Sequence, residues 1–254
     1  MDPFRESRQR GLAARGRRVL LGLLVLSTAL FAASMHSGVY AQSIVIDDFN
    51  SGALTVVLNS APGTAANFVD GNAGTVLQTE RNLRVSGSSV AGGNISATSG
   101  IGSYSFTRPA GSDGTMEIWW DGNNNSTTFM PTGLGGVNLT ANGQNAFRFQ
   151  VTSSSSAALS LAFYVWTDGG NLSRGELTLP AAGGTVDLPY SSFSVFGGAG
   201  ASFTNVGALF LGTTSPSNQA WTAVIDDLRT VQSALIFSDG FATGTTVRWS
   251  SVAP

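Results

Sequence analysis

Hydrophobic and polar residues alternate along much of this chain, and no long stretch beyond residue 41 shows the 3.6-residue period of a helix. Alternation with period two indicates strands, and the clusters of Gly, Ser, Asn and Thr between them indicate turns. Short strands at roughly regular spacing are typical of an antiparallel sandwich or barrel. The segments predicted as strands are 43–49, 53–59, 74–86, 101–107, 114–121, 144–152, 158–168, 174–179, 184–189, 207–212 and 219–230.

Three of these segments can be divided into a core face and an outer face, because successive side chains of a strand point to opposite sides. The predicted core residues are Met116, Ile118, Trp120, Phe147, Phe149, Val151, Leu161, Phe163 and Val165. Aromatic and polar side chains remain for the outer faces. Aromatic rings stack on sugar rings, and polar groups bond sugar hydroxyls. The predicted ligand-binding residues are Glu117, Trp119, Asp121, Arg148, Gln150, Tyr164, Trp166 and Asp168.

The first 41 residues have the pattern of a secretory signal peptide. Six arginines lie within residues 1–18, an apolar run follows from Val19 to Ala33, and Val39-Tyr40-Ala41 has small residues where a signal peptidase cleaves. The apolar run is shorter than the ~20 residues that a membrane-spanning helix needs. We therefore expect export, by the general or the twin-arginine route, of a mature chain that begins near Gln42 and has no transmembrane segment.

The composition of the mature chain excludes several functions. Every basic residue is arginine, cysteine is absent, and the single histidine is His36, within the signal. Ser-His-Asp catalysis, cysteine nucleophiles and zinc sites built on His or Cys are therefore excluded. Of the 13 basic and 15 acidic residues, six arginines and two acids precede residue 42, which leaves seven arginines, thirteen acids and a formal net charge of −6. This charge does not suit nucleic acid as a partner.

Several motifs resemble those of known exported families. Gly183–Phe193, Asn205–Leu211 and Val224–Leu228 resemble strands of galactose-binding-like jelly rolls, which include carbohydrate-binding modules. Thr79–Leu83 and Pro131–Thr140 resemble a group of secreted bacterial proteins of unknown function, many of which carry a PEP-type sorting tail. The resemblance implies an all-β jelly-roll sandwich over residues 42–232 and export, but no particular activity.

A pair of aspartates lies near each end of this predicted domain, in "IVIDDF" (44–49) and "AVIDDL" (223–228). In such jelly rolls the first and last strands lie close together, and many carbohydrate-binding relatives hold a structural calcium there. The resemblance thus implies calcium ligands at Asp47, Asp48, Asp226 and Asp227, since calcium takes six to eight oxygen ligands. Those relatives usually have Phe-Glu where this chain has Phe49-Asn50.

The last residues, 233–254, form a predicted C-terminal tail. Asp239-Gly240-Phe241-Ala242-Thr243-Gly244, followed by Trp249-Ser250, resembles a short C-terminal signature of secreted proteins from Gram-negative bacteria. The tail is a candidate sorting or attachment signal, or an extra edge strand.

The leading functional hypothesis is an exported, non-enzymatic protein that binds glycan at the cell surface or in the extracellular matrix. A structural or assembly protein of the envelope or biofilm is the alternative. A glycosidase needs two suitably spaced carboxyl groups. The mature chain has only three glutamates, Glu80, Glu117 and Glu176. Glu80 is expected to pair with an arginine because Arg81 is beside it, so no pair of acids stands out.

Overall fold

The computed structural model describes residues 42–155, 159–213 and 219–233. The chain divides into two units, Met1–Gln42 and Ser43–Pro254. Only Gln42 of the first unit is described. The predicted signal peptide and all but the first residue of the predicted tail lie outside the described residues. No helix in the described ranges has the length and hydropathy to cross a membrane.

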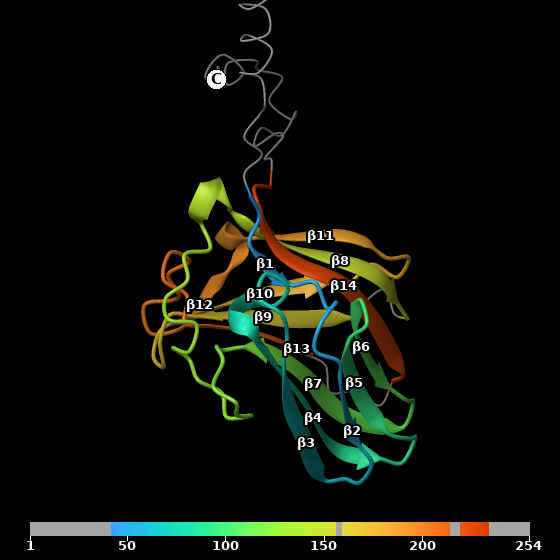
Figure 1. The fold of residues 1–254 in the computed structure, drawn as a ribbon. Coiled ribbons are helices and arrows are strands. Elements are labelled where there is room, and N and C mark those ends of the chain that lie inside the picture. Colours follow the sequence, from blue (N-terminus) through green and yellow to red (C-terminus); the bar gives the residue numbers. More distant parts are fainter. Residues whose placement is uncertain (1–41, 156–158, 214–218, 234–254) are drawn as a thin grey trace, which may run out of the picture. The chain divides into compact units, whose positions relative to one another are not determined.

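The described residues from Ser43 to Ser233 form two antiparallel seven-stranded sheets that pack as a β-sandwich, which confirms the predicted jelly-roll fold (Figure 1). Sheet A has the order β11-β8-β14-β6-β5-β2, and β1 also pairs with β14. Its strands are β1 (Val45–Asp47), β2 (Leu54–Leu58), β5 (Ile95–Gly100), β6 (Ser103–Arg108), β8 (Ala146–Ser154), β11 (Gly184–Pro189) and β14 (Trp221–Val231).

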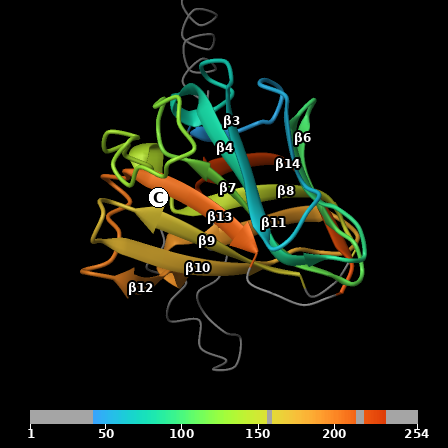
Figure 2. The same cartoon turned by 90° about the horizontal axis from the view of Figure 1, so that it is seen from below.

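Sheet B has the order β12-β10-β9-β13-β7-β4-β3, and its strands can be followed in Figure 2. They are β3 (Gly63–Asp70), β4 (Glu80–Val90), β7 (Ser112–Trp120), β9 (Ser160–Trp166), β10 (Leu172–Thr178), β12 (Ser194–Gly197) and β13 (Ala208–Thr213). Three short 3₁₀ helices, Leu77–Thr79, Ala141–Gly143 and Tyr190–Ser192, lie in the connections.

The core lies between the two sheets and is built from the residues that alternation predicted. All nine predicted core residues are buried. Phe147 and Phe149 of sheet A contact Phe163 of sheet B, at ring-centroid distances of 4.6 and 5.5 Å. Each fully buried side chain of this size contributes about 1.5–3 kcal/mol.

The first and last strands of the domain are neighbours, as predicted. Val45 pairs with Arg229 and Asp47 with Leu228, so β1 adds to the end of β14. Beyond Ile225, β14 contains a bulge, because Ile225 is opposite Val151 and Asp227 is opposite Gln150, with Asp226 as the extra residue. The bulge sets the directions of the second aspartate pair.

Candidate functional site

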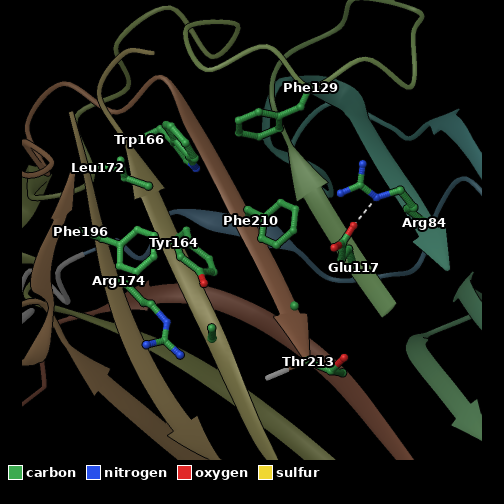
Figure 3. A pocket seen from close by; sticks show the side chains of 12 residues that line it. Arg84, Glu117, Phe129, Tyr164, Trp166, Leu172, Arg174, Phe196, Phe210 and Thr213 are labelled. Carbon is green, nitrogen blue, oxygen red and sulfur yellow. Dashed lines mark hydrogen bonds and ion pairs between the residues drawn. The ribbon is translucent and has the colours of Figure 1, made fainter. Parts of the chain in front are cut away.

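The outer face of sheet B carries an open cleft with a volume of about 660 Å³. Strands β4, β7, β9, β10, β12 and β13 supply its lining, together with the connection after β7 (Figure 3). The lining residues are Arg84, Glu117, Phe129, Ala162, Tyr164, Trp166, Leu172, Arg174, Phe196, Phe210, Gly212 and Thr213.

The cleft follows from two adjacent cross-strand rows. One row pairs Arg174 with Tyr164, Tyr164 with Phe210, and Phe210 with Trp119. The next row, two residues along each strand, runs Glu176, Ala162, Gly212, Glu117 and Arg84. Side chains two residues apart share a face, so both rows point outward.

Small residues in the second row keep the floor of the cleft low. Ala162 and Gly212 lie between the larger side chains of Glu176 and Glu117. A Cβ atom added to Gly212 would lie 2.9 Å from Cε1 of Phe210, which is too close for an unchanged ring position. The small residues Ala162 and Gly212 thus form a shallow trough beside the row of aromatic rings.

Aromatic rings form one side of the cleft. Tyr164 contacts Phe196 and Phe210 edge to face, at centroid distances of 5.5 and 5.7 Å. Phe129, from the connection after β7, contacts Trp166 at 5.3 Å. Phe196 is 60% exposed at the rim, which is unusual for a large hydrophobic side chain. Figure 3 shows these rings as a continuous group.

Trp119 does not have the exposure that the sequence predicted. Its outward direction is correct, but the side chain is 1% exposed. Phe210 stacks on it at 6.2 Å, Phe129 contacts it at 6.4 Å, and the Arg84 guanidinium lies 5.3 Å from its ring centroid. A loop whose position alternation does not predict thus covers the ring, and Trp119 supports the cleft from below.

Charged side chains stand on both sides of the aromatic group. Arg84 forms an ion pair with Glu117 on one side. On the other, Arg174 pairs with Glu176 at 2.6 Å and lies 5.8 Å from the Tyr164 ring centroid. The indole N–H of Trp166 has no acceptor among the described residues. The cleft therefore combines ring surfaces with hydrogen-bond donors and acceptors.

Asp121 and Asp168 are engaged in local structure. Asp121 is fully buried, and its Oδ2 accepts a bond from the Met130 N–H at 2.6 Å. Burial above all, with the nearby charge of Glu80 adding to it, raises the pKa of Asp121 to about 6. Oδ1 of Asp168 accepts bonds from the backbone N–H groups of Gly170 and Asn171, so this carboxylate holds its own turn. Neither lines the cleft.

Arg148 and Gln150 lie on the other sheet. They point away from the core as predicted, but β8 belongs to sheet A, so the core separates them from the cleft. Arg148 forms a two-bond ion pair with Asp187 at 2.7 and 2.8 Å, and Gln150 accepts a bond from Thr185 at 2.9 Å. The Arg148 hydrogen bond lowers the pKa of Asp187. Alternation predicts which face of its strand a side chain is on, but not which sheet the strand joins. The residues predicted to form one surface therefore lie on the outer faces of two different sheets.

The structure does not bring the four predicted calcium ligands together as a set. Asp47 is fully buried, whereas Asp48, which follows β1, is partly exposed. Asp227 pairs with Arg229 at 2.7 Å, and Asp226 is exposed at the bulge. In the described part of the chain, no group of three or more His, Cys, Asp or Glu is placed to hold a metal ion. Calcium at this junction stays a prediction that these side chains do not favour.

Asp47 instead joins the two sheets. Its Oδ2 lies 2.9 Å from Nε of Arg81 on β4 and accepts a bond from the Trp120 indole at 2.9 Å. Its Oδ1 accepts bonds from Arg81 and from the Phe49 N–H. Burial raises the pKa of Asp47, while Arg81 and the hydrogen bonds favour its charged form. Because the Arg81 guanidinium already neutralises this carboxylate, Asp47 suits its arginine partner and not a metal ion.

The cleft also contains residues that sequence reasoning did not select. Phe210 and Arg174 lie in predicted strands, so alternation of 207–212 and 174–179 carried a signal for them. Phe196 is on β12, which was not predicted, and Phe129 lies in an irregular connection. No local pattern indicates that these two side chains reach the cleft. Glu117, Tyr164 and Trp166 are the predicted ligand residues that line it.

Comparison with known proteins yields structural likeness only. No family model matches the chain, and no curated protein matches it. A family 11 carbohydrate-binding module of the cellulase Lic26A-Cel5E of Clostridium thermocellum is 15% identical, covering 76% of this chain and 96% of that one with a TM-score of 0.39. A family 29 carbohydrate-binding module is 11% identical, with 76% and 99% coverage and a TM-score of 0.33. At these values the likeness identifies neither a ligand nor any site residue of this chain.

Proposed function

We propose that this chain is an exported, non-catalytic protein that binds a glycan in the cleft on the outer face of sheet B. The observation that carries the proposal is the row formed by Arg174, Tyr164 and Phe210 beside the low floor at Ala162 and Gly212. The rings of Tyr164 and Phe210 stand above this floor, so an elongated, flat ligand that lies on the floor can contact them.

The chemistry of the lining suits a sugar. Sugar rings have apolar C–H faces, which pack on aromatic rings, and hydroxyl groups, which need donors and acceptors. Tyr164 and Phe210 supply rings, while Arg174 and the Arg84–Glu117 pair supply polar groups on both sides. The distance across the sheet from β10 to β7 is about 14 Å, three strand spacings. A cleft of this width and openness favours a chain of sugars over a single small molecule.

The arrangement of acids supports binding without hydrolysis. Glycosidases place two carboxyl groups about 5–10 Å apart. Glu117 and Glu176 lie in one cross-strand row, but β13 and β9 separate their strands, and each is paired with an arginine. Their backbones are thus about 14 Å apart.

The location outside the cell is proposed from the sequence. The arginine-rich start, the apolar run and the small residues before Gln42 support export. The C-terminal resemblance to a Gram-negative signature supports retention at the cell surface or in the matrix.

A glycan array probed with the purified full chain tests the proposal. We expect binding to a small set of polysaccharides or oligosaccharides, and Tyr164→Ala should weaken it at least tenfold because a ring surface is lost. Arg148→Ala is the matched control on sheet A and should bind as the wild type does. Absence of binding to every glycan, or equal loss in both variants, would contradict the proposal.

One observation favours the alternative, a structural or assembly protein. Val195 and Phe196 are 62% and 60% exposed on β12, the edge strand of sheet B. Exposed edge strands with hydrophobic side chains promote association. Sedimentation of the same sample distinguishes the two functions: self-association that Val195→Lys abolishes, with no glycan bound, would favour assembly.

A further inference from the structure

A second polar cluster lies under the connection after β7, outside the cleft. It contains two fully buried carboxylates, Glu80 at the start of β4 and Asp121 just after β7. Asn82 is opposite Trp119 in the β4–β7 ladder, and continuing that register by two residues sets Glu80 opposite Asp121. Like charges directly opposite each other destabilise a sheet.

Neither carboxylate has a cationic partner among the described residues. No ion pair within the described ranges includes Glu80 or Asp121. Their bonds come from neutral groups. The amide of Asn82 lies 3.2 Å from both, the backbone N–H of Asn125 donates to Glu80 at 2.7 Å, and that of Met130 donates to Asp121 at 2.6 Å. A buried charge is costly unless it is paired or coordinates a metal.

The amides around this pair are incompletely bonded. Asn82 is fully buried with its terminal amide between the two carboxylates, yet its Oδ1 has no partner. Oδ1 of Asn124 is likewise buried without a partner, while its Nδ2 lies 3.5 Å from Asp121. A half-turn of each amide exchanges its nitrogen and oxygen. That rotation presents the Asn82 oxygen to both acids and the Asn124 oxygen to Asp121.

We propose that Glu80 and Asp121, with the amide oxygens of Asn82 and Asn124, bind a calcium ion. The donor set consists of oxygen alone, which suits a hard cation, and two carboxylates, two amides and waters supply the six to eight ligands that calcium takes. The ion supplies the positive charge that the cluster lacks. This site is distinct from the β1–β14 junction, where Arg81 already neutralises Asp47.

Calorimetry and melting of the chelator-treated full chain test the proposal. We expect one calcium per chain, and a melting temperature about 5 °C or more higher when free calcium is ~100-fold above Kd. Glu80→Gln and Asp121→Asn should each weaken calcium binding at least tenfold. Asp227→Asn removes a carboxylate from the β1–β14 junction and should leave calcium affinity unchanged.

Two results would overturn the proposal. One is identical melting in calcium and in chelator, with no heat of binding. The other is a calcium response that survives in Glu80→Gln and Asp121→Asn but is lost in Asp227→Asn.

A probe of the wild type covers the case in which a variant fails to fold. Terbium replaces calcium in oxygen sites, and Trp120, adjacent to Asp121, can transfer excitation to it. We expect terbium luminescence on tryptophan excitation that calcium displaces, and its absence would overturn the proposal.

Discussion

The two sheets of this sandwich have outer faces of opposite character. On sheet A, charged side chains pair within the face: Arg148 with Asp187 and Arg229 with Asp227. On sheet B, aromatic rings occupy the middle strands, and the ion pairs Arg84–Glu117 and Arg174–Glu176 stand at the sides of a cleft. Both faces have the polar–apolar alternation of a half-exposed strand.

The difference lies in which residues are small. In sheet B the row through Ala162 and Gly212 leaves space above the sheet, while Tyr164 and Phe210 beside it are large. On sheet A, Arg148 and Asp187 are directly opposite and fill the surface between β8 and β11 with their own contact. A binding face thus depends on a row of large side chains beside a row of small ones. The presence of polar and aromatic residues alone is not enough.

The largest effect should come from breaking the link between the sheets, on which both faces depend. Arg81→Met leaves the buried carboxylate of Asp47 without its cation, which should lower the free energy of unfolding by about 3–5 kcal/mol. Urea denaturation measures it. Arg229→Met removes the same group from a partly exposed pair and should cost at most about 1 kcal/mol. Equal losses of unfolding free energy in the two variants would show that the Asp47–Arg81 ion pair does not link the two sheets as its burial indicates.

The next effect concerns the low row of sheet B. Gly212→Val raises the floor and displaces Phe210, so affinity for a cleft-bound glycan should fall at least tenfold, or about 1.4 kcal/mol. Titration calorimetry with the best glycan from the array measures it. Thr222→Val is the control on sheet A, since Thr222 is exposed on β14. Undiminished affinity in Gly212→Val would mean that the glycan does not enter the trough.

A smaller effect is expected at the rim. Phe196→Ala removes a ring that is 60% exposed and contacts Tyr164 at its edge. Affinity should fall about three- to tenfold, the equivalent of about 0.7–1.4 kcal/mol, while the melting temperature changes little because the ring buries little surface. A large loss of stability with unchanged affinity would make Phe196 part of the fold and not of the binding face.

Alternation predicted the fold well because the core strands bury one complete face. It failed at β3, β5 and β12, which were not predicted as strands. β3 and β12 are edge strands of sheet B, and β5 is built from small residues such as Ala97 and Ser99, so none shows strong contrast between its faces. Strands are predicted from the difference in hydrophobicity between their two faces, and an edge strand can form with only a small difference.

The site was predicted in part, and the errors have a common cause. Glu117, Tyr164 and Trp166 line the cleft, and alternation along one strand, which is local, placed them on that face. Their role as ligand-binding residues stays a prediction. Arg148 was assigned to the same surface, but which sheet a strand joins depends on long-range pairing. Glu80 was expected to pair with an arginine, because Arg81 is beside it. Neighbours in a strand point to opposite faces, so Arg81 pairs with Asp47 between the sheets, while Glu80 lies on the other face of sheet B, buried under the connection after β7.

The smallest effect tests whether Arg148 on sheet A has only a structural role. Arg148 lowers the pKa of Asp187 below its ordinary 3.8, so the folded state favours the charged carboxylate. The pair's contribution is therefore present above the unfolded pKa and is lost as the pH falls through the lowered folded value. Because both side chains are partly exposed, it should amount to about 0.2–1 kcal/mol. Arg148→Ala should thus be less stable than wild type by this amount at pH 6 and equal to it at a pH below the lowered pKa, as measured by urea denaturation at each pH. A difference in stability that persists unchanged in acid would mean that Arg148 stabilises the fold by packing its alkyl chain. A loss of glycan affinity in the same variant would mean that Arg148, although on β8 of sheet A, takes part in binding.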